Sequence, residues 1–292
     1  MRRRAALLTA ACLLLLATPA RAQGPQLSLL HFQPAAGPEN IFITETGLIP
    51  QHLSPYAGLF LSYAHKPLQL YNATTDSTVR DVVSYQLNFD LVIAMGLWDR
   101  LEIGIGLPAT LAQGSDGLDG FGLGADATLS GGIGDLRLVP KGRLATVGPV
   151  TFAVALPITF PTASGDNFLG DDTVTFTPKA VVSLAMGRVD AGLNAGYRIR
   201  GERNFTLPGT QNHVVVDDEV VLSAGARVEA WKDVMDVMAD FYMSLAVEEQ
   251  DKEEVPVELL VGARFNVTKG MMAHVGGGPG LTRGVGTPVF RV

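Results

Sequence analysis

Charged side chains recur at alternate positions along several apolar stretches of this chain, and they are its clearest chemical signal. The set comprises Asp90, Glu102, Arg137, Lys141, Arg143, Lys179, Asp190, Arg198, Glu219, Arg227, Asp236, Asp240, Glu258 and Arg264. Acids and bases are mixed, so these residues could line a water-filled interior and tune which ions enter it. They could instead pair with one another and leave no continuous water path. We favour passage, and both hypotheses require that the side chains point into one shared interior.

Other residue types form no reactive constellation. The five histidines are scattered, without the spacing of a zinc site. Gly104-x-Gly106 is a fragment of a dinucleotide-binding motif, but no strand-to-helix context accompanies it. Ser62 with His65, or Ser84, lacks the spacing that would support a barrel hydrolase. We therefore predict no enzyme activity, no catalytic residue, no cofactor and no metal centre.

Acidic residues in two predicted loops leave calcium as an open question. Asp116 and Asp119 lie in a glycine-rich stretch, and residues 217–219 (Asp-Asp-Glu) lie near another loop. Their oxygens suit Ca²⁺, although their spacing is not that of an EF-hand. The acidic run at 248–254 is most simply a solvated loop.

The hairpin over residues 85–107 indicates how the charges would be positioned. Between Leu87 and Met95 every odd position is apolar, and the even positions begin with Gln, Asn and Asp. After a pause at residues 96–100 the alternation resumes at Leu101. Because side chains alternate faces along a strand, one face of this hairpin is apolar and the other is polar or small.

The same alternation extends to the end of the chain. It predicts strands over residues 56–64, 81–95, 101–110, 136–145, 150–160, 173–186, 189–199, 214–230, 234–247, 255–265, 271–278 and 289–292. Short turns (96–100, 146–149, 187–188, 231–233, 266–270) alternate with longer polar loops (65–80, 111–135, 161–172, 200–213, 248–254, 279–288).

This alternation of short and long connections is typical of a membrane barrel, which has short turns on the periplasmic side and long loops outside. Lipid offers no hydrogen bonds, so the strands must close on themselves and face apolar residues outward. We therefore predict an all-β fold, a transmembrane antiparallel up-and-down β-barrel of about 12 strands. Trp98 and Trp231 fall in predicted short turns, where aromatic rings anchor at the membrane interface. A soluble β-sandwich is the alternative, and it would bury the apolar faces against each other.

The N-terminus carries an export signal. Arg2, Arg3 and Arg4 precede an apolar segment at 5–17, and Ala-Arg-Ala at 20–22 resembles a cleavage site. We predict a signal peptide over 1–22, a periplasmic lead-in over 23–55 that could include one short strand near 41–44, and the barrel over 56–292. After residue 20 no apolar run approaches the roughly 18–20 residues of a spanning helix.

Cysteine usage and charge restrict the partners of the exported chain. The only cysteine, Cys12, falls in the leader, so the mature chain would have neither disulfides nor thiolate chemistry. Without the four arginines of the leader, 18 basic residues face 29 acidic ones, which makes nucleic acid a poor partner. We expect outer-membrane lipid, the barrel-assembly machinery and a small solute as partners.

Short stretches of the chain resemble two groups of outer-membrane barrels. Residues 132–137 (GIGDLR) resemble a signature of the phenol-degradation meta-pathway transporter-like barrels. Residues 57–67, 96–108 and 284–292 (GVGTPVFRV) look like the N-terminal β-barrel of OmpA-family proteins. The resemblance covers most of residues 30–292, and its motifs are structural turns. It implies the outer membrane of a Gram-negative cell.

The two resemblances imply different functions. The transporter-like barrels imply passive transport of a small solute, which could be apolar, and we favour this function. The OmpA-family barrels imply a non-conducting structural envelope protein. OmpA-family relatives also carry acidic repeats and a peptidoglycan-binding domain, which this sequence lacks, and their last strand continues past the position of Val292. We therefore expect a truncated last strand, with the segment near 41–44 as another means of closing the barrel.

Overall fold

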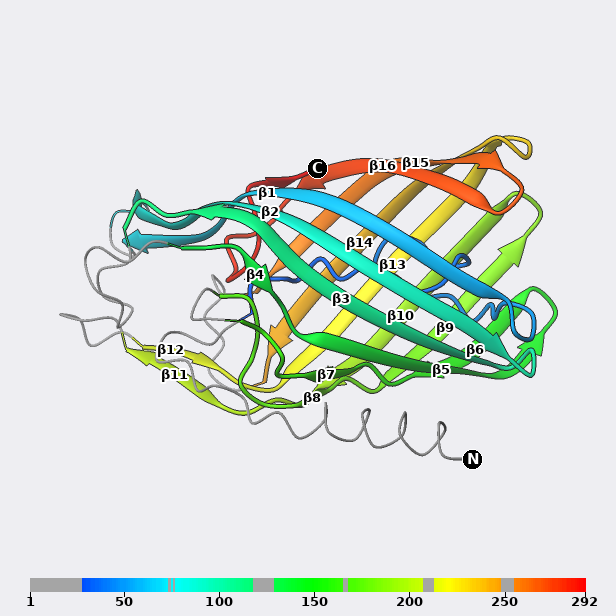
Figure 1. Ribbon diagram of the computed structural model, residues 1–292, viewed down its shortest axis with the longest axis horizontal. Coiled ribbons are helices and arrows are strands. Elements are labelled where there is room, and N and C mark those ends of the chain that lie inside the picture. Colours follow the sequence, from blue (N-terminus) through cyan, green and yellow to red (C-terminus); the bar gives the residue numbers. More distant parts are fainter. Residues whose placement is uncertain are drawn as a thin grey trace, which may run out of the picture.

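The computed structural model describes residues 28–72, 75, 77–117, 129–164, 168–206, 213–247 and 255–292, which form one antiparallel β-barrel (Figure 1). The predicted signal peptide lies outside these residues. Twelve strands make the wall, so the predicted fold class is confirmed. The described residues contain no helix long and apolar enough to cross a membrane.

The strands follow the chain around the barrel. They are β1 (Pro55–Asn72), β2 (Ser77–Leu97), β3 (Leu101–Gly114), β4 (Gly132–Ile133) leading into β5 (Leu136–Val147), β6 (Val150–Ala155) continued by β7 (Ile158–Phe160), β8 (Thr175–Phe176) leading into β9 (Lys179–Met186), β10 (Val189–Arg198), β13 (Glu219–Trp231), β14 (Met235–Ala246), β15 (Val257–Thr268), β16 (Met271–Pro279) and β17 (Phe290–Arg291). β17 pairs with both β16 and β1 and so closes the sheet. A separate hairpin, β11 (Arg203–Thr206) and β12 (His213–Val216), interrupts the connection from β10 to β13.

Strand structure extends into several of the predicted long loops, among them residues 111–135, which include the end of β3 and all of β4. β1 and β2 continue through most of residues 65–80, so that only residues 73–76 connect them. Their register shifts between His65 and Leu68, where Lys66 has a φ of 51°. Such a bulge bends a strand without ending its pairing. β11 and the first residue of β12 fall in another predicted loop, residues 200–213.

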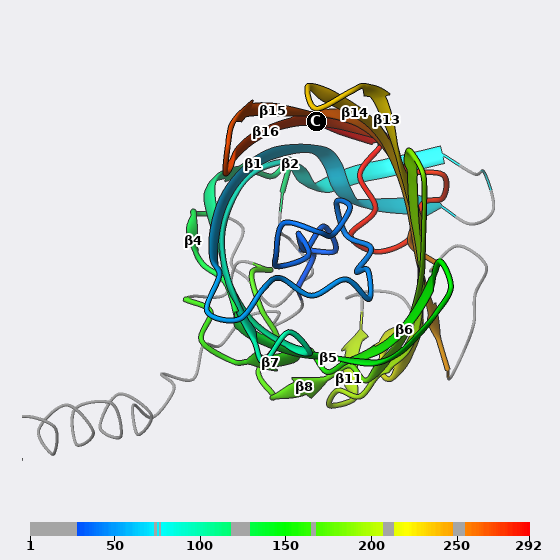
Figure 2. The same cartoon turned by 90° about the vertical axis from the view of Figure 1, so that its right-hand side faces the viewer.

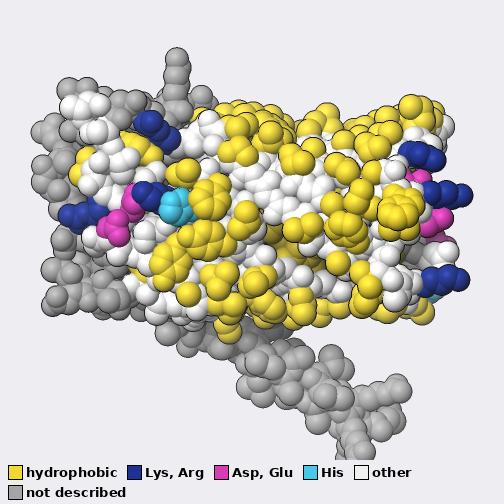
Figure 3. Space-filling view, turned by 90° about the horizontal axis from the view of Figure 1, so that it is seen from above, with side chains coloured by type: hydrophobic (Ala, Val, Ile, Leu, Met, Phe, Trp, Pro, Cys, Tyr) yellow, Lys and Arg dark blue, Asp and Glu magenta, His cyan; other side chains and the backbone are white. Residues whose placement is uncertain are grey.

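The barrel is apolar outside and polar inside. Leu59, Leu61, Leu193 and Val275 are between 56 and 67% exposed. On the face that Figure 3 shows, hydrophobic side chains form a broad band across the wall, and charged groups gather at both ends. A soluble sandwich would bury these apolar faces against each other, so the structure excludes that alternative. The outward face is the one that lipid requires.

The two ends of the barrel differ. At one, here called the turn end, the connections are tight turns such as residues 98–100, 187–188 and 269–270. Trp98 and Trp231 both lie at this end and are 67% and 66% exposed. Membrane anchoring by these rings stays a prediction. The longer connections meet at the opposite end, here called the loop end.

Residues 28–54, here called the plug, lie inside the barrel (Figure 2). At the loop end the Leu29 amide donates to the carbonyl of Phe168 (3.2 Å), and at the turn end the Leu53 amide donates to that of Gly96 (2.8 Å). The structure therefore places these residues in the lumen, where the sequence had indicated a lead-in ahead of the barrel. No strand forms at residues 41–44, and β17 closes the sheet without them. A segment without strand periodicity can be ordered here because the wall satisfies its backbone groups.

Candidate functional site

Most of the charges in the lumen neutralise one another between strands of the wall. The ion pairs are Glu102–Lys141, Asp190–Arg227, Arg198–Glu219, Asp236–Arg264 and Glu258–Arg291. The first four join residues that stand directly opposite each other in adjacent strands. They therefore run along the wall, from one strand to its neighbour. Arg291 was missed by the sequence analysis because it lies in a strand of only two residues.

The Glu102–Lys141 pair is the most deeply buried of these. Its side chains are 2% and 0% exposed, and Lys141 Nζ lies 3.0 Å from Glu102 Oε1. Breaking such a pair leaves an uncompensated buried charge, which typically costs about 3–5 kcal/mol. We expect Lys141→Met to lower the unfolding midpoint of the barrel in urea, followed by heat-modifiable gel mobility. The double variant Glu102→Gln, Lys141→Met should recover much of that loss. Equal stability of all three proteins would contradict this assignment.

A second group of wall residues holds the plug. The carboxylate of Asp240 accepts the backbone amides of Ile43 (2.8 Å) and Thr44 (2.9 Å) and the Thr44 hydroxyl (2.6 Å). No cation lies within ion-pair distance of Asp240 among the described residues. The negative charge of Asp240 is instead stabilised by the hydrogen-bond donors of the plug. Charge-assisted hydrogen bonds of this kind are among the stronger ones in proteins.

Basic and neutral polar residues hold other parts of the plug. Arg137 donates to Gln33 Oε1 (2.7 Å) and to the carbonyl of Pro34 (2.8 Å). Asn194 accepts from the amide of Glu45 and donates to its carbonyl, each at 2.8 Å. Ser183 accepts the amide of Gly47 (2.9 Å), and Lys141 donates to Asn40 Oδ1 (3.1 Å). Asn194 and Ser183 were missed as site residues, although both occupy inward positions of predicted strands.

The plug also has an apolar contact with the wall. Ile41, Phe42 and Ile43 form a buried cluster with residues of β14 and β15. A Cβ atom on Gly262 or Gly276 would lie within 2.7–2.8 Å of Phe42 Cζ, so these glycines leave the space that the ring fills. The plug is thus packed as well as hydrogen-bonded.

Arg143 stands apart from the predicted lumen set. Its guanidinium donates to the carbonyl of Asp99 at the turn end. The other charges of that set lie on inward positions of the wall, and most of them are buried.

Two of the acidic residues considered as calcium ligands have partners within the protein. Asp218 accepts the backbone amide of Arg200 (2.9 Å) and the hydroxyl of Tyr197 (3.0 Å), and Glu219 pairs with Arg198. Asp119 lies outside the described residues. Within the described ranges no group of three His, Asp or Glu side chains could hold a metal ion.

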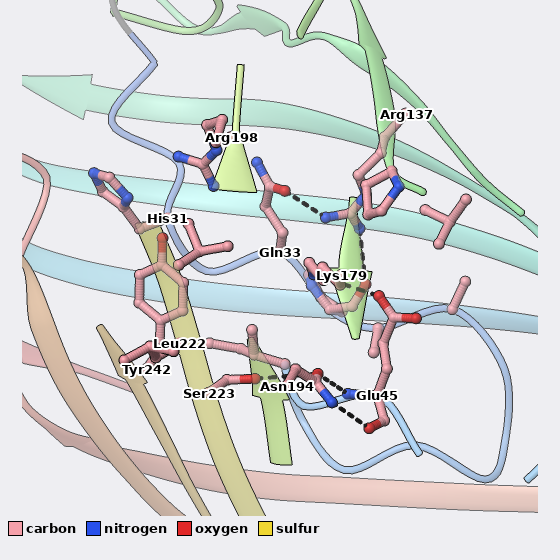
Figure 4. Close-up of a pocket in the computed structure, with 17 residues that line it drawn as sticks. His31, Gln33, Glu45, Arg137, Lys179, Asn194, Arg198, Leu222, Ser223 and Tyr242 are labelled. Atoms are coloured by element: carbon pink, nitrogen blue, oxygen red, sulfur yellow. Dashed lines mark hydrogen bonds and ion pairs between the residues drawn. The ribbon is translucent and has the colours of Figure 1, made fainter. Parts of the chain in front are cut away.

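Two small cavities remain between plug and wall. The inner one, about 30 Å³, is bounded by residues such as Glu45, Asn194 and Ser223 (Figure 4). The outer one, about 50 Å³, lies nearer the loop end, against Leu169 and Asp171. Six residues line both cavities: His31, Gln33, Arg137, Pro157, Lys179 and Arg198. Each cavity holds a few water molecules at most.

Comparison with known proteins finds a similar fold in an outer membrane channel. The structure is similar to the crystal structure of the COG4313 outer membrane channel from Pseudomonas putida F1, with a TM-score of 0.64 over 84% of this chain and 94% of that one. The two share a fold. Their sequences are 15% identical, so the similarity concerns architecture alone. No family model and no curated protein matches the chain. The barrel fold that both predicted resemblances imply is thereby supported, and the OmpA-family relationship stays a prediction.

Proposed function

We propose that this chain is a narrow passive channel of the Gram-negative outer membrane, and that the plug restricts the passage of small solutes. The observation that carries the proposal is the interior: a polar lumen inside an apolar shell, occupied by a segment of the same chain. A purely structural barrel needs no wet interior, whereas a channel needs a polar path. The expected partners remain outer-membrane lipid, the barrel-assembly machinery and the solute.

Hydrogen bonding explains how the plug can hold one position in the lumen and still be released from the wall. Its backbone groups bond to side chains of the wall, such as Asp240, Asn194 and Ser183. Water can replace such partners, so releasing the plug costs less than opening the sheet, whose backbone bonds have no substitute in lipid. The wall therefore stays closed while the lumen changes.

Single-channel recording from the refolded chain in a planar bilayer tests the proposal. We expect small, stable conductance steps, because the cavities beside the plug are narrow. Heat-modifiable gel mobility establishes that the protein in the bilayer is folded. A folded barrel that gives no steps under any applied voltage would contradict the channel and favour the structural envelope protein instead.

A further inference from the structure

Three cations meet where the two cavities join. Arg137 comes from β5, Lys179 from the start of β9 and Arg198 from the end of β10, and each lines both cavities. Figure 4 shows their side chains around the same space, together with Gln33 and His31 of the plug. A solute that moves between the cavities must pass these groups.

In the lining of the inner cavity these three cations outnumber the carboxylates. Arg137 donates to two neutral oxygens, and its Nε is buried without a hydrogen-bond partner among the described residues. Lys179 reaches one described carboxylate, that of Glu45, at 3.4 Å. Arg198 shares Glu219 with Arg200. A buried cation without a paired anion is costly, so an interior that keeps one has room for a compensating anion.

The excess of cations over carboxylates is largest in the inner cavity. In the lining of the inner cavity, Glu45 is the one carboxylate facing the three cations. The outer cavity adds Arg200 together with Asp90, Asp135 and Asp171. Asp135 is occupied by the backbone amides of residues 162, 163 and 171.

We propose that the junction of Arg137, Lys179 and Arg198 binds small carboxylate anions and makes the channel anion-preferring. The inference rests on the proposed channel function and names its solute class. A carboxylate fits the fork of a guanidinium and suits a second cation beside it. The cavities admit a group of that size, and their small volumes disfavour large solutes.

Reversal potentials in a gradient of potassium chloride, and then of potassium acetate, test the site. We expect the native channel to prefer the anion, and Arg137→Met to lower the anion-to-potassium permeability ratio by about tenfold. Arg143→Met removes the same charge at the turn end and should leave the ratio almost unchanged. Lys179→Met is the second variant, used if Arg137→Met does not fold.

The outcomes separate the two proposals. Steps that are non-selective or cation-selective would overturn the anion site and leave the channel intact. Equal loss of selectivity in Arg137→Met and Arg143→Met would also overturn it. Where the folded barrel gives no steps, the anion site is tested by acetate binding to the detergent-folded protein, which is measured by NMR line broadening. Equal broadening by native protein and Arg137→Met would then reject the site.

Discussion

Replacing Asp240 by Ala is expected to release the plug and add large conductance steps to the small ones of the native channel. The substitution removes the acceptor of three hydrogen bonds and leaves the amides of Ile43 and Thr44 without their partner. A loss of roughly 3 kcal/mol for such a charged acceptor corresponds to about a 100-fold change in the plugged-to-unplugged ratio. Single-channel recording measures the frequency of the large steps.

Thr110→Val is the matched control. It also removes a buried hydrogen bond, from Thr110 to Asn88 at 2.8 Å, but both residues belong to the wall. Limited proteolysis gives an independent measurement, because a glutamate-specific protease can reach Glu45, which is buried, only when the plug leaves the lumen. Cleavage should be faster in Asp240→Ala than in Thr110→Val. If the two variants show the same steps and the same cleavage rate, the wall residue does not hold the plug.

A disulfide between the plug and β13 should have the opposite effect. A Cβ atom on Gly225 would lie 3.2 Å from the Cβ of Thr44. Disulfide-bonded cysteines place these atoms about 3.5–4.5 Å apart, so a small adjustment suffices in Thr44→Cys, Gly225→Cys. The nearest obstacle is Ile41 Cδ1 at 2.9 Å, the flexible end of its side chain. In the Asp240→Ala background we expect the large steps to vanish in the oxidised protein and to return when a thiol reductant is added.

The chain suits this experiment because its one other cysteine, Cys12, falls in the predicted leader. Each single cysteine variant is a control, since neither can form the bond and both should be insensitive to the reductant. Combined with Asp240→Ala, the oxidised pair should suppress the large steps that Asp240→Ala creates. Large steps that persist at full oxidation would show that the plug is not the element that widens the lumen.

The strands were predictable because the residue pattern of each strand reflects the two environments that its faces contact. Between Leu87 and Met95 the alternation of apolar and polar residues reports lipid on one side and the lumen on the other, and β2 contains that whole stretch. Register could not be predicted in the same way. That Lys141 faces Glu102 depends on how two strands slide past each other, which no single strand encodes.

The plug was not predictable from its own residues. It has neither helical nor strand periodicity, because its hydrogen-bond partners are wall residues far away in sequence. Glu45 bonds to Asn194, which is 149 positions further along the chain. An Asn at an inward position looks like any other polar lumen residue, and only the folded barrel shows which polar groups face water and which face the plug.

The path of the plug also constrains the order of folding. The residues from Leu29 to Leu53 run from the loop end to the turn end before β1 begins. The bond between Thr44 and Asp240 spans 196 residues, and that between Pro38 and Arg264 spans 226. Contacts between residues so far apart in sequence form late. Closing the long intervening loop costs chain entropy, and this cost comes before the contacts themselves stabilise the fold. Each newly made barrel should therefore pass through a stage in which most of the wall exists and the lumen is still empty, and its permeability is highest before its folding is complete.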